Sequence, residues 1–180
     1  MKSNYASRAK KFLLVFSKYL PDSQYLNITQ ITKAVLEYKR DYPTRRIKIA
    51  SGCSRVVICT SDYAIKIDQR EENWFGTSKD ELEVYKFALK RGFDHLFLPV
   101  EKYSINKQIF YIFPRIKSTI YNRPCACRYD ENDSYVYHEF FHEKDREFLD
   151  KYIEDLHLNN ISTFHGKPVI IDYACHAPLL

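Results

Sequence analysis

Five side chains spread along the sequence have the types needed for phosphoryl transfer. Lys66 lies in a β-rich segment, a glutamate stands on the helix expected next, and Asp155, Asn160 and Asp172 follow later in the chain. A strand lysine can neutralise phosphate charge while a helix carboxylate holds the lysine in place. One aspartate can orient a hydroxyl group, and asparagine and aspartate oxygens are suitable ligands for Mg²⁺. No single residue is specific, so the prediction rests on their order.

A second pattern, His138-Glu139-Phe140-Phe141-His142, predicts different chemistry. On an α-helix, the pattern H-E-x-x-H places two imidazoles on one face for Zn²⁺, with the glutamate as general base. Such a site needs a third protein ligand, and several acidic candidates, including Asp155 and Asp172, already belong to the first pattern. A zinc-dependent hydrolase is therefore the lesser alternative to a helix whose histidines face solvent or the core.

Two amphipathic helices are expected ahead of the lysine strand. Apolar residues recur at helical spacing in residues 7–20 and the pattern stops at Pro21, while Asn27 is expected to cap a second helix. Residues 1–50 hold eleven basic and three acidic side chains, so this segment carries the positive charge of the chain. It could steer an acidic partner protein, a nucleic acid or a membrane surface, although a solvated helix face is an equally good interpretation.

The lysine strand belongs to a predicted β-meander. Strands are expected at residues 46–49, 55–59 and 63–67, a helix at 78–90 ending at Arg91-Gly92, and further strands at 96–100 and 108–113. This order is βββαββ. Beyond it, the pattern predicts a helix within residues 135–153, a hairpin around His165-Gly166-Lys167-Pro168, and a strand at 169–171 that leads into Asp172.

Composition limits the class of protein. With 180 residues, of which 45% are hydrophobic and 28% charged, the chain is globular rather than disordered and has room for one ordinary core. Only four glycines are present, which excludes a glycine-rich phosphate loop of the usual kind. Five cysteines without a C-x-x-C pair, a polar N-terminus and short apolar runs favour a soluble protein of the reducing cytoplasm.

The order and spacing of these residues resemble the protein-kinase fold. Tyr63-Ala64-Ile65-Lys66 stands where that family has Val-Ala-Ile-Lys, residues 155–160 match Asp-x-x-x-x-Asn, and Asp172-Tyr173-Ala174 stands at Asp-Phe-Gly. The sequence of residues 155–173 looks especially like that of small kinase-like proteins encoded by bacteriophages. The resemblance covers roughly residues 46–176.

This resemblance implies an α+β, minimal two-lobed fold. Residues 46–116 would form the N-lobe, with a five-stranded antiparallel sheet and one helix, and residues 117–180 a truncated C-lobe. Residues 1–45 would be the basic helical extension. The implied cofactors are ATP and Mg²⁺, and the implied partner is a protein substrate or target.

The resemblance also implies a role for each site residue. Asp155 would be the catalytic aspartate, Lys66 would bind phosphate, and Asn160 and Asp172 would hold Mg²⁺. Lys66 would pair with Glu81 or Glu83, which point to different sides of the helix; we favour Glu81, four residues before Tyr85. The nucleotide would also contact Gly52, Ser54, Arg55, Val57 and, less specifically, Ile116.

Departures from the family leave two functions open. The loop over residues 50–57 keeps only the middle glycine and the final valine, Ile153-Glu154 replaces the usual His-Arg, and the sequence ends eight residues after Asp172, before any activation segment. We expect phosphorylation of a hydroxyl on a partner, on a host protein if the chain is viral, or on the protein itself. The alternative is a weak or inactive kinase-like module that sequesters a partner protein. Nucleic acid is not expected as a partner, because no recognition motif with interleaved stacking aromatics is evident.

Overall fold

The computed structural model describes residues 4–52, 54–69, 77–116, 139–154, 156, 160–174 and 176–179. Contacts divide the chain into two units, Met1–Lys79 with Val100–Arg115 and Asp80–Pro99 with Ile116–Leu180. The predicted N-terminal extension therefore belongs with the sheet. Residues 80–99, which we expected in the first lobe, belong to the second unit.

The first unit opens with the two predicted helices, α1 (Tyr5–Phe16) and α2 (Ile28–Asp41). A short 3₁₀ turn, η1 (Ser17–Tyr19), ends the first helix just before Pro21. Asn27 caps α2 with a capping box: its Oδ1 accepts from the Gln30 backbone N at 2.9 Å, and Gln30 Oε1 accepts from the Asn27 backbone N at 3.0 Å. The box satisfies two backbone donors at the start of α2, which is why the helix begins there.

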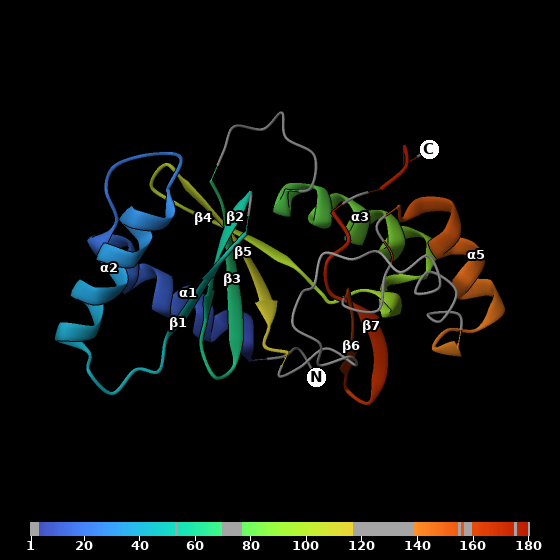
Figure 1. Ribbon diagram of the computed structural model, residues 1–180, viewed down its shortest axis with the longest axis horizontal. Coiled ribbons are helices and arrows are strands. Elements are labelled where there is room, and N and C mark those ends of the chain that lie inside the picture. Colours follow the sequence, from blue (N-terminus) through green and yellow to red (C-terminus); the bar gives the residue numbers. More distant parts are fainter. Residues whose placement is uncertain are drawn as a thin grey trace. The chain divides into compact units, whose positions relative to one another are not determined.

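Five antiparallel strands form the sheet of the first unit, as predicted. They are β1 (Lys48–Ser51), β2 (Arg55–Cys59), β3 (Tyr63–Asp68), β4 (Glu101–Ile105) and β5 (Gln108–Pro114), in the spatial order β1-β2-β3-β5-β4 (Figure 1). The fourth strand was wrongly predicted at residues 96–100. That apolar run instead makes one isolated parallel bridge, between Phe97 and Ile170, so it is buried without joining the sheet.

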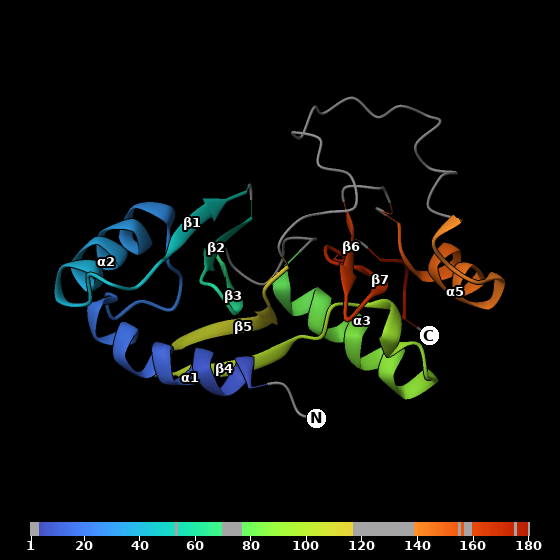
Figure 2. The same ribbon diagram turned by 90° about the horizontal axis from the view of Figure 1, so that it is seen from below.

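The two faces of the sheet differ in what covers them. In β3 the side chains of Tyr63, Ile65 and Ile67 are buried, whereas the alternating Ala64, Lys66 and Asp68 are only partly buried. The buried set joins apolar side chains of α1 and α2 in one core, which includes Leu13, Phe16, Ile31 and Val35. Helix α1 runs along β4 and β5 (Figure 2). The N-terminal helices thus cover one face, and Lys66 lies on the other.

The second unit has a compact aromatic core. Its helices are α3 (Ser78–Arg91), whose first two residues belong to the first unit, and α5 (Glu143–Tyr152). It also contains a 3₁₀ turn, η2 (Asp94–Leu96), and a hairpin formed by β6 (Ile161–Phe164) and β7 (Lys167–Ile170). The Phe148 ring lies 4.3 Å from that of Phe93 and 4.9 Å from that of Tyr152, measured between centroids. Gly92 has a φ of +79°, the left-handed conformation that commonly ends a helix. Within the described residues, no helix has the length and apolar character that a bilayer crossing requires.

Candidate active site

Lys66 lies on the sheet face that the N-terminal helices leave uncovered. The register places it opposite Val57 of β2 and Tyr111 of β5, and residues directly opposite each other share a face. Its Nζ lies 4.5 Å from the centroid of the Phe113 ring. The predicted phosphate-binding lysine and Val57, a predicted nucleotide contact, are therefore neighbours on one surface.

The turn between β1 and β2 holds the other predicted loop residues. The Gly52 backbone N donates to the Arg55 carbonyl at 2.9 Å, and the Ser54 carbonyl accepts from the Gln69 backbone N at 2.9 Å. Arg55 pairs with Asp68 across the strands and so shares the face of Lys66. A Cβ built on Gly52 meets no atom of the described residues within 4 Å, apart from its chain neighbours. Ile116, the last predicted nucleotide contact, is half-buried just after β5.

Asp68 ties the start of α3 to the strand that carries Lys66. Its Oδ1 accepts from the Ser78 backbone N at 3.0 Å and from Ser78 Oγ at 2.7 Å. This carboxylate supplies an acceptor at a helix N-terminus, where backbone N–H groups lack partners inside the helix. We did not predict this role, because Asp68 and Ser78 are ten residues apart and no local capping pattern joins them.

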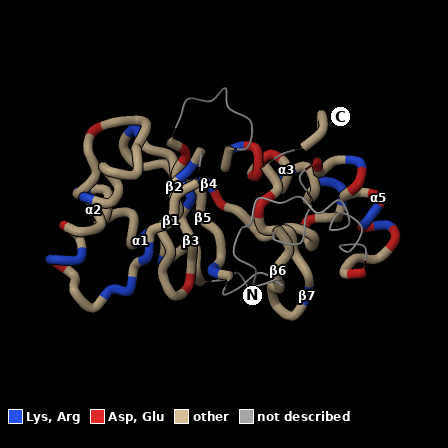
Figure 3. Tube along the Cα trace, viewed as in Figure 1, with Lys and Arg blue, Asp and Glu red and all other residues tan. Residues whose placement is uncertain are grey.

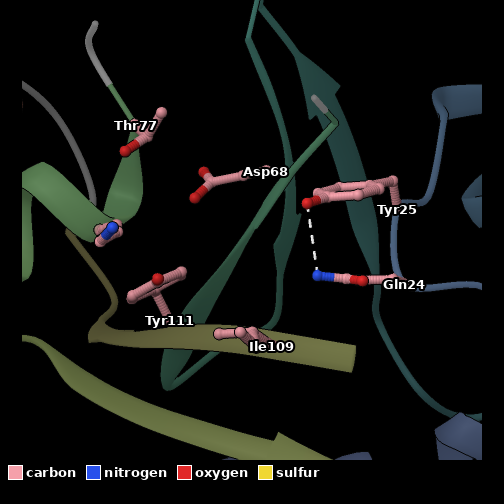
Figure 4. Close-up of a pocket in the computed structure, with 7 residues that line it drawn as sticks. Gln24, Tyr25, Asp68, Thr77, Ile109 and Tyr111 are labelled. Carbon is pink, nitrogen blue, oxygen red and sulfur yellow. Dashed lines mark hydrogen bonds between the residues drawn. The ribbon is translucent and has the colours of Figure 1, made fainter. Parts of the chain in front are cut away.

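A small pocket adjoins Asp68 on the same sheet face. Figure 4 shows the Asp68 carboxylate between Thr77 and Tyr25, with Ile109 and Tyr111 of β5 beside it. The pocket volume is about 50 Å³. That is room for about one or two water molecules, whereas small-molecule sites usually occupy about 300–1,000 Å³. This pocket is too small to hold a nucleotide.

The two glutamates of α3 have opposite environments. Glu81 is completely buried, with a relative exposure of 0%, and Glu83 is exposed. Burying a carboxylate is costly unless it is paired or hydrogen-bonded, so the position of Glu81 demands a polar neighbour. Of the two residues that the sequence left open as a partner for Lys66, Glu81 is the one held inside the fold.

The hairpin of the second unit brings Asn160 and Asp172 to the same end. Ile161 pairs with Ile170, and the Ile171 backbone N donates to the Asn160 carbonyl at 2.8 Å. Asn160 therefore directly precedes β6, and Asp172 lies one residue beyond Ile171, the residue opposite Asn160. Asn160 is buried, with 8% exposure, and Asp172 is half-buried. Asp155, the predicted catalytic aspartate, lies outside the described residues.

Tyr173 anchors the chain directly after Asp172. Its ring is buried 4.8 Å from that of Phe97, and its hydroxyl donates to the Leu98 carbonyl at 2.6 Å. At the other end of the hairpin, His165 and Gly166 both have positive φ, which a tight two-residue turn requires. Both ends of the hairpin are therefore fixed, and so is the backbone that presents Asp172.

The zinc motif does not meet its structural requirement. His138 lies outside the described residues, and Glu139–His142 form a 3₁₀ turn and a bend rather than an α-helix, because α5 begins only at Glu143. His142 is the N-cap residue of α5. Among the described residues, no three His, Cys, Asp or Glu side chains are grouped as a metal site would need. The helical spacing that would align two imidazoles is therefore missing.

Comparisons with known proteins are sparse. No protein-family model matches the chain, and no curated protein matches it. A solved structure, the Legionella pneumophila Lpg2603 kinase bound to IP6, is similar over 75% of this chain and 61% of its own, with 14% identity and a TM-score of 0.37. The chain thus spans less than two thirds of that structure. An identity and a TM-score this low carry no conclusion about this chain.

Proposed function

We propose that the protein has a minimal kinase-like fold and is an ATP- and Mg²⁺-dependent phosphotransferase of the protein-kinase-like class. It transfers the γ-phosphate to a hydroxyl of a partner protein, a host protein if the chain is phage-encoded, or to one of its own. Such catalysis depends mostly on positioning and charge neutralisation. The observation that carries the proposal is the convergence of Asn160 and Asp172 at one end of the β6–β7 hairpin.

This pair suits Mg²⁺ chemically. An amide oxygen and a carboxylate are hard oxygen donors, and a hard cation held by few protein ligands is typical of nucleotide sites. Asn160 and Asp172 would hold the ion, which when bound neutralises phosphate charge. Asn160 is a buried polar side chain beside a rigid hairpin, so it would be positioned before the cation arrives.

The first unit supplies a surface that suits the phosphates and the base. Lys66 shares its face with Val57 and Arg55, and a Cβ built on Gly52 meets no atom of the described residues within 4 Å, apart from its chain neighbours. Lys66 would neutralise the phosphates, Val57 would contact the base together with Ile116, and the turn with Ser54 would lie over the phosphates. Glu81 would hold Lys66 in place, and Asp155 would orient the acceptor hydroxyl.

A kinase-like binding module without catalysis is the second candidate. The turn between β1 and β2 supports it, because Ala50 and Arg55 occupy positions where the family has glycines. A Cβ and a long side chain restrict close approach of backbone N–H groups to phosphate. In this case the protein would sequester a partner, and the basic N-terminal segment would contact an acidic one.

Two measurements on the full chain separate these candidates. The first is the shift in Tm on adding ATP and Mg²⁺, and the second is transfer of labelled phosphate to the protein itself or to a generic acceptor such as casein. We expect ATP–Mg²⁺ to stabilise the wild type and Glu83→Gln alike, and Glu81→Gln less. We expect Asp172→Asn to lower transfer roughly a hundredfold, by analogy with the loss of one stabilising group in an active site.

Matched variants make the result interpretable. Asp22→Asn removes the same charge at a position whose side chain is 74% exposed in a surface ion pair with Lys107, and it should transfer phosphate like the wild type. Nucleotide stabilisation without any transfer would favour the binding module. Absence of both stabilisation and transfer would refute the nucleotide site altogether.

A further inference from the structure

A second, larger cavity of about 720 Å³ lies in the first unit, on the opposite sheet face from Lys66. Tyr63 lines this cavity. It lies three residues before Lys66 on β3, so the two side chains point to opposite faces of the sheet, and Tyr63 is on the face that the N-terminal helices cover. The other walls come from α1, α2, the segment between α2 and β1, and the β2–β3 turn. This basic cavity, as we name it for its four cationic residues Arg8, Lys11, Arg45 and Arg46, is distinct from the candidate active site.

The positive charge of the basic cavity is only partly compensated. Arg8 Nη1 donates to Asp62 Oδ2 at 2.7 Å, and this hydrogen bond holds the pKa of the Asp62 carboxyl below its usual range. Among the described residues, no ion pair involves Lys11, Arg45 or Arg46. Figure 3 shows Lys and Arg in blue along α1 and in the segment between α2 and β1. About three positive charges thus converge on one cavity without an acidic partner.

A buried tyrosine lines the same cavity. Tyr38 is only 3% exposed, and its hydroxyl makes no hydrogen bond with the residues that the structure describes. Burial raises the pKa of Tyr38, and the positive charge of Arg45 opposes this rise. Burial likewise raises the pKa of Tyr63 to about 12, again opposed by Arg45. Arg45, Tyr38 and Tyr63 all line this cavity, and the raised pKa values keep both tyrosines protonated and able to donate at neutral pH.

An aromatic rim accompanies these polar groups. The Tyr42 ring stacks on the Tyr38 ring with 4.7 Å between centroids, and Tyr42 is 41% exposed. An exposed flat ring at the mouth of a cavity offers a surface for an organic group. The cavity volume falls within the range of about 300–1,000 Å³ that is usual for small-molecule sites. Charge, donors and size together describe a site for a compact polyanion.

We propose that the basic cavity binds a small molecule that carries two adjacent phosphate groups. A diphosphate at neutral pH bears about the charge that Lys11, Arg45 and Arg46 leave uncompensated, and arginine forks bind phosphate oxygens in pairs. The Tyr38 hydroxyl donates to a further oxygen, and the remainder of the ligand lies against the Tyr42 rim. This site is additional to the proposed ATP site and does not depend on Mg²⁺.

The test uses inorganic pyrophosphate as the probe, titrated calorimetrically into the full chain in a buffer with EDTA. We expect binding that weakens as salt is added. Arg45→Gln and Arg46→Gln should each weaken it about tenfold or more, because each removes charge-assisted hydrogen bonds. Arg45→Lys should recover part of the loss. Lys33→Gln removes an equal charge from an exposed position on α2 outside the cavity and should bind like the wild type. Equal Tm values without ligand would show that the variants are folded.

Other probes and variants separate this site from alternatives. Pyrophosphate binding should be unchanged in Lys66→Met. If binding were instead lost in Lys66→Met and unchanged in Arg45→Gln, pyrophosphate would bind on the other sheet face, and the proposal would be overturned. Citrate binding as tight as pyrophosphate would show recognition of charge alone and would also overturn it. If a single-stranded oligonucleotide bound far more tightly than pyrophosphate, and the same arginine variants abolished that binding, the cavity would be a nucleic-acid interface and the diphosphate proposal would be wrong. No pyrophosphate binding at millimolar concentration would refute it directly.

Discussion

The tie between Asp68 and Ser78 should be the most sensitive polar contact of the first unit. Asp68 Oδ1 accepts two hydrogen bonds from Ser78, and Ser78 has no exposed surface. Asp68→Ala removes the acceptor at the start of α3, a loss worth about 0.5–2 kcal/mol, and leaves a buried hydroxyl without this partner, which costs about 1–3 kcal/mol. We therefore expect the free energy of unfolding to fall by about 2–4 kcal/mol.

A double-mutant cycle isolates this contact. Ser78→Ala removes only the hydroxyl bond and should cost about 1 kcal/mol, and the double variant should cost clearly less than the sum of the two single changes. Urea unfolding of the four proteins measures the coupling, with Asp22→Ala as a control whose exposed side chain should matter little. Coupling below about 0.3 kcal/mol, the scatter expected of independent sites, would refute the reasoning. The same variants should bind ATP–Mg²⁺ more weakly if α3 must be anchored for Glu81 to act.

Two further outcomes can be checked with single substitutions. Gly52→Ala should leave the free energy of unfolding unchanged or slightly raised, because its new Cβ meets no atom of the described residues within 4 Å. The same change should weaken ATP–Mg²⁺ binding if the phosphates approach this backbone. A thermal-shift titration that gave wild-type affinity would contradict that placement. The hydrogen bond from Arg8 lowers the pKa of Asp62 in the folded protein. The ionised Asp62 carboxylate therefore stabilises the fold fully above its pKa in the unfolded chain, about 4. This stabilisation is lost as the pH falls through the lower pKa of the folded state. The small Tm advantage of the wild type over Asp62→Asn at pH 6 should therefore shrink as the pH falls below the unfolded value and vanish once the folded carboxylate is protonated. An advantage that persisted in that acid range would show that the carboxylate charge is not its source.

Local patterns were enough to predict most elements of the first unit. The alternation in Tyr63-Ala64-Ile65-Lys66 and the β-rich run at 55–59 correspond to β3 and β2, and Asn27 caps α2 with Gln30 three residues later. These signals act between neighbours in the chain. Side chains alternate along a strand, and the structure adds that Tyr63, Ile65 and Ile67 are the buried set, which leaves Lys66 on the less buried face.

What the sequence could not predict depends on residues far apart in the chain. The apolar run at 96–100 has the composition of a strand, but its partner is Ile170, and the sheet position goes to the more polar β4. The basic cavity needs Lys11 of α1 beside Arg45 and Arg46, which only the packing of two helices on the sheet provides. The excess of positive charge was visible in the sequence, but the concave surface that gathers it was not.

The division of the chain into two units has a consequence for how the protein can form. Each unit is assembled from two separate stretches, and residues 80–99 are inserted between β3 and the last two strands of the sheet. When only the first 79 residues have left the ribosome, β3 has β2 on one side and nothing to pair with on the other. Its partner β5 arrives more than thirty residues later, so a hydrophobic strand edge stays open during synthesis, the kind of edge that recruits other chains.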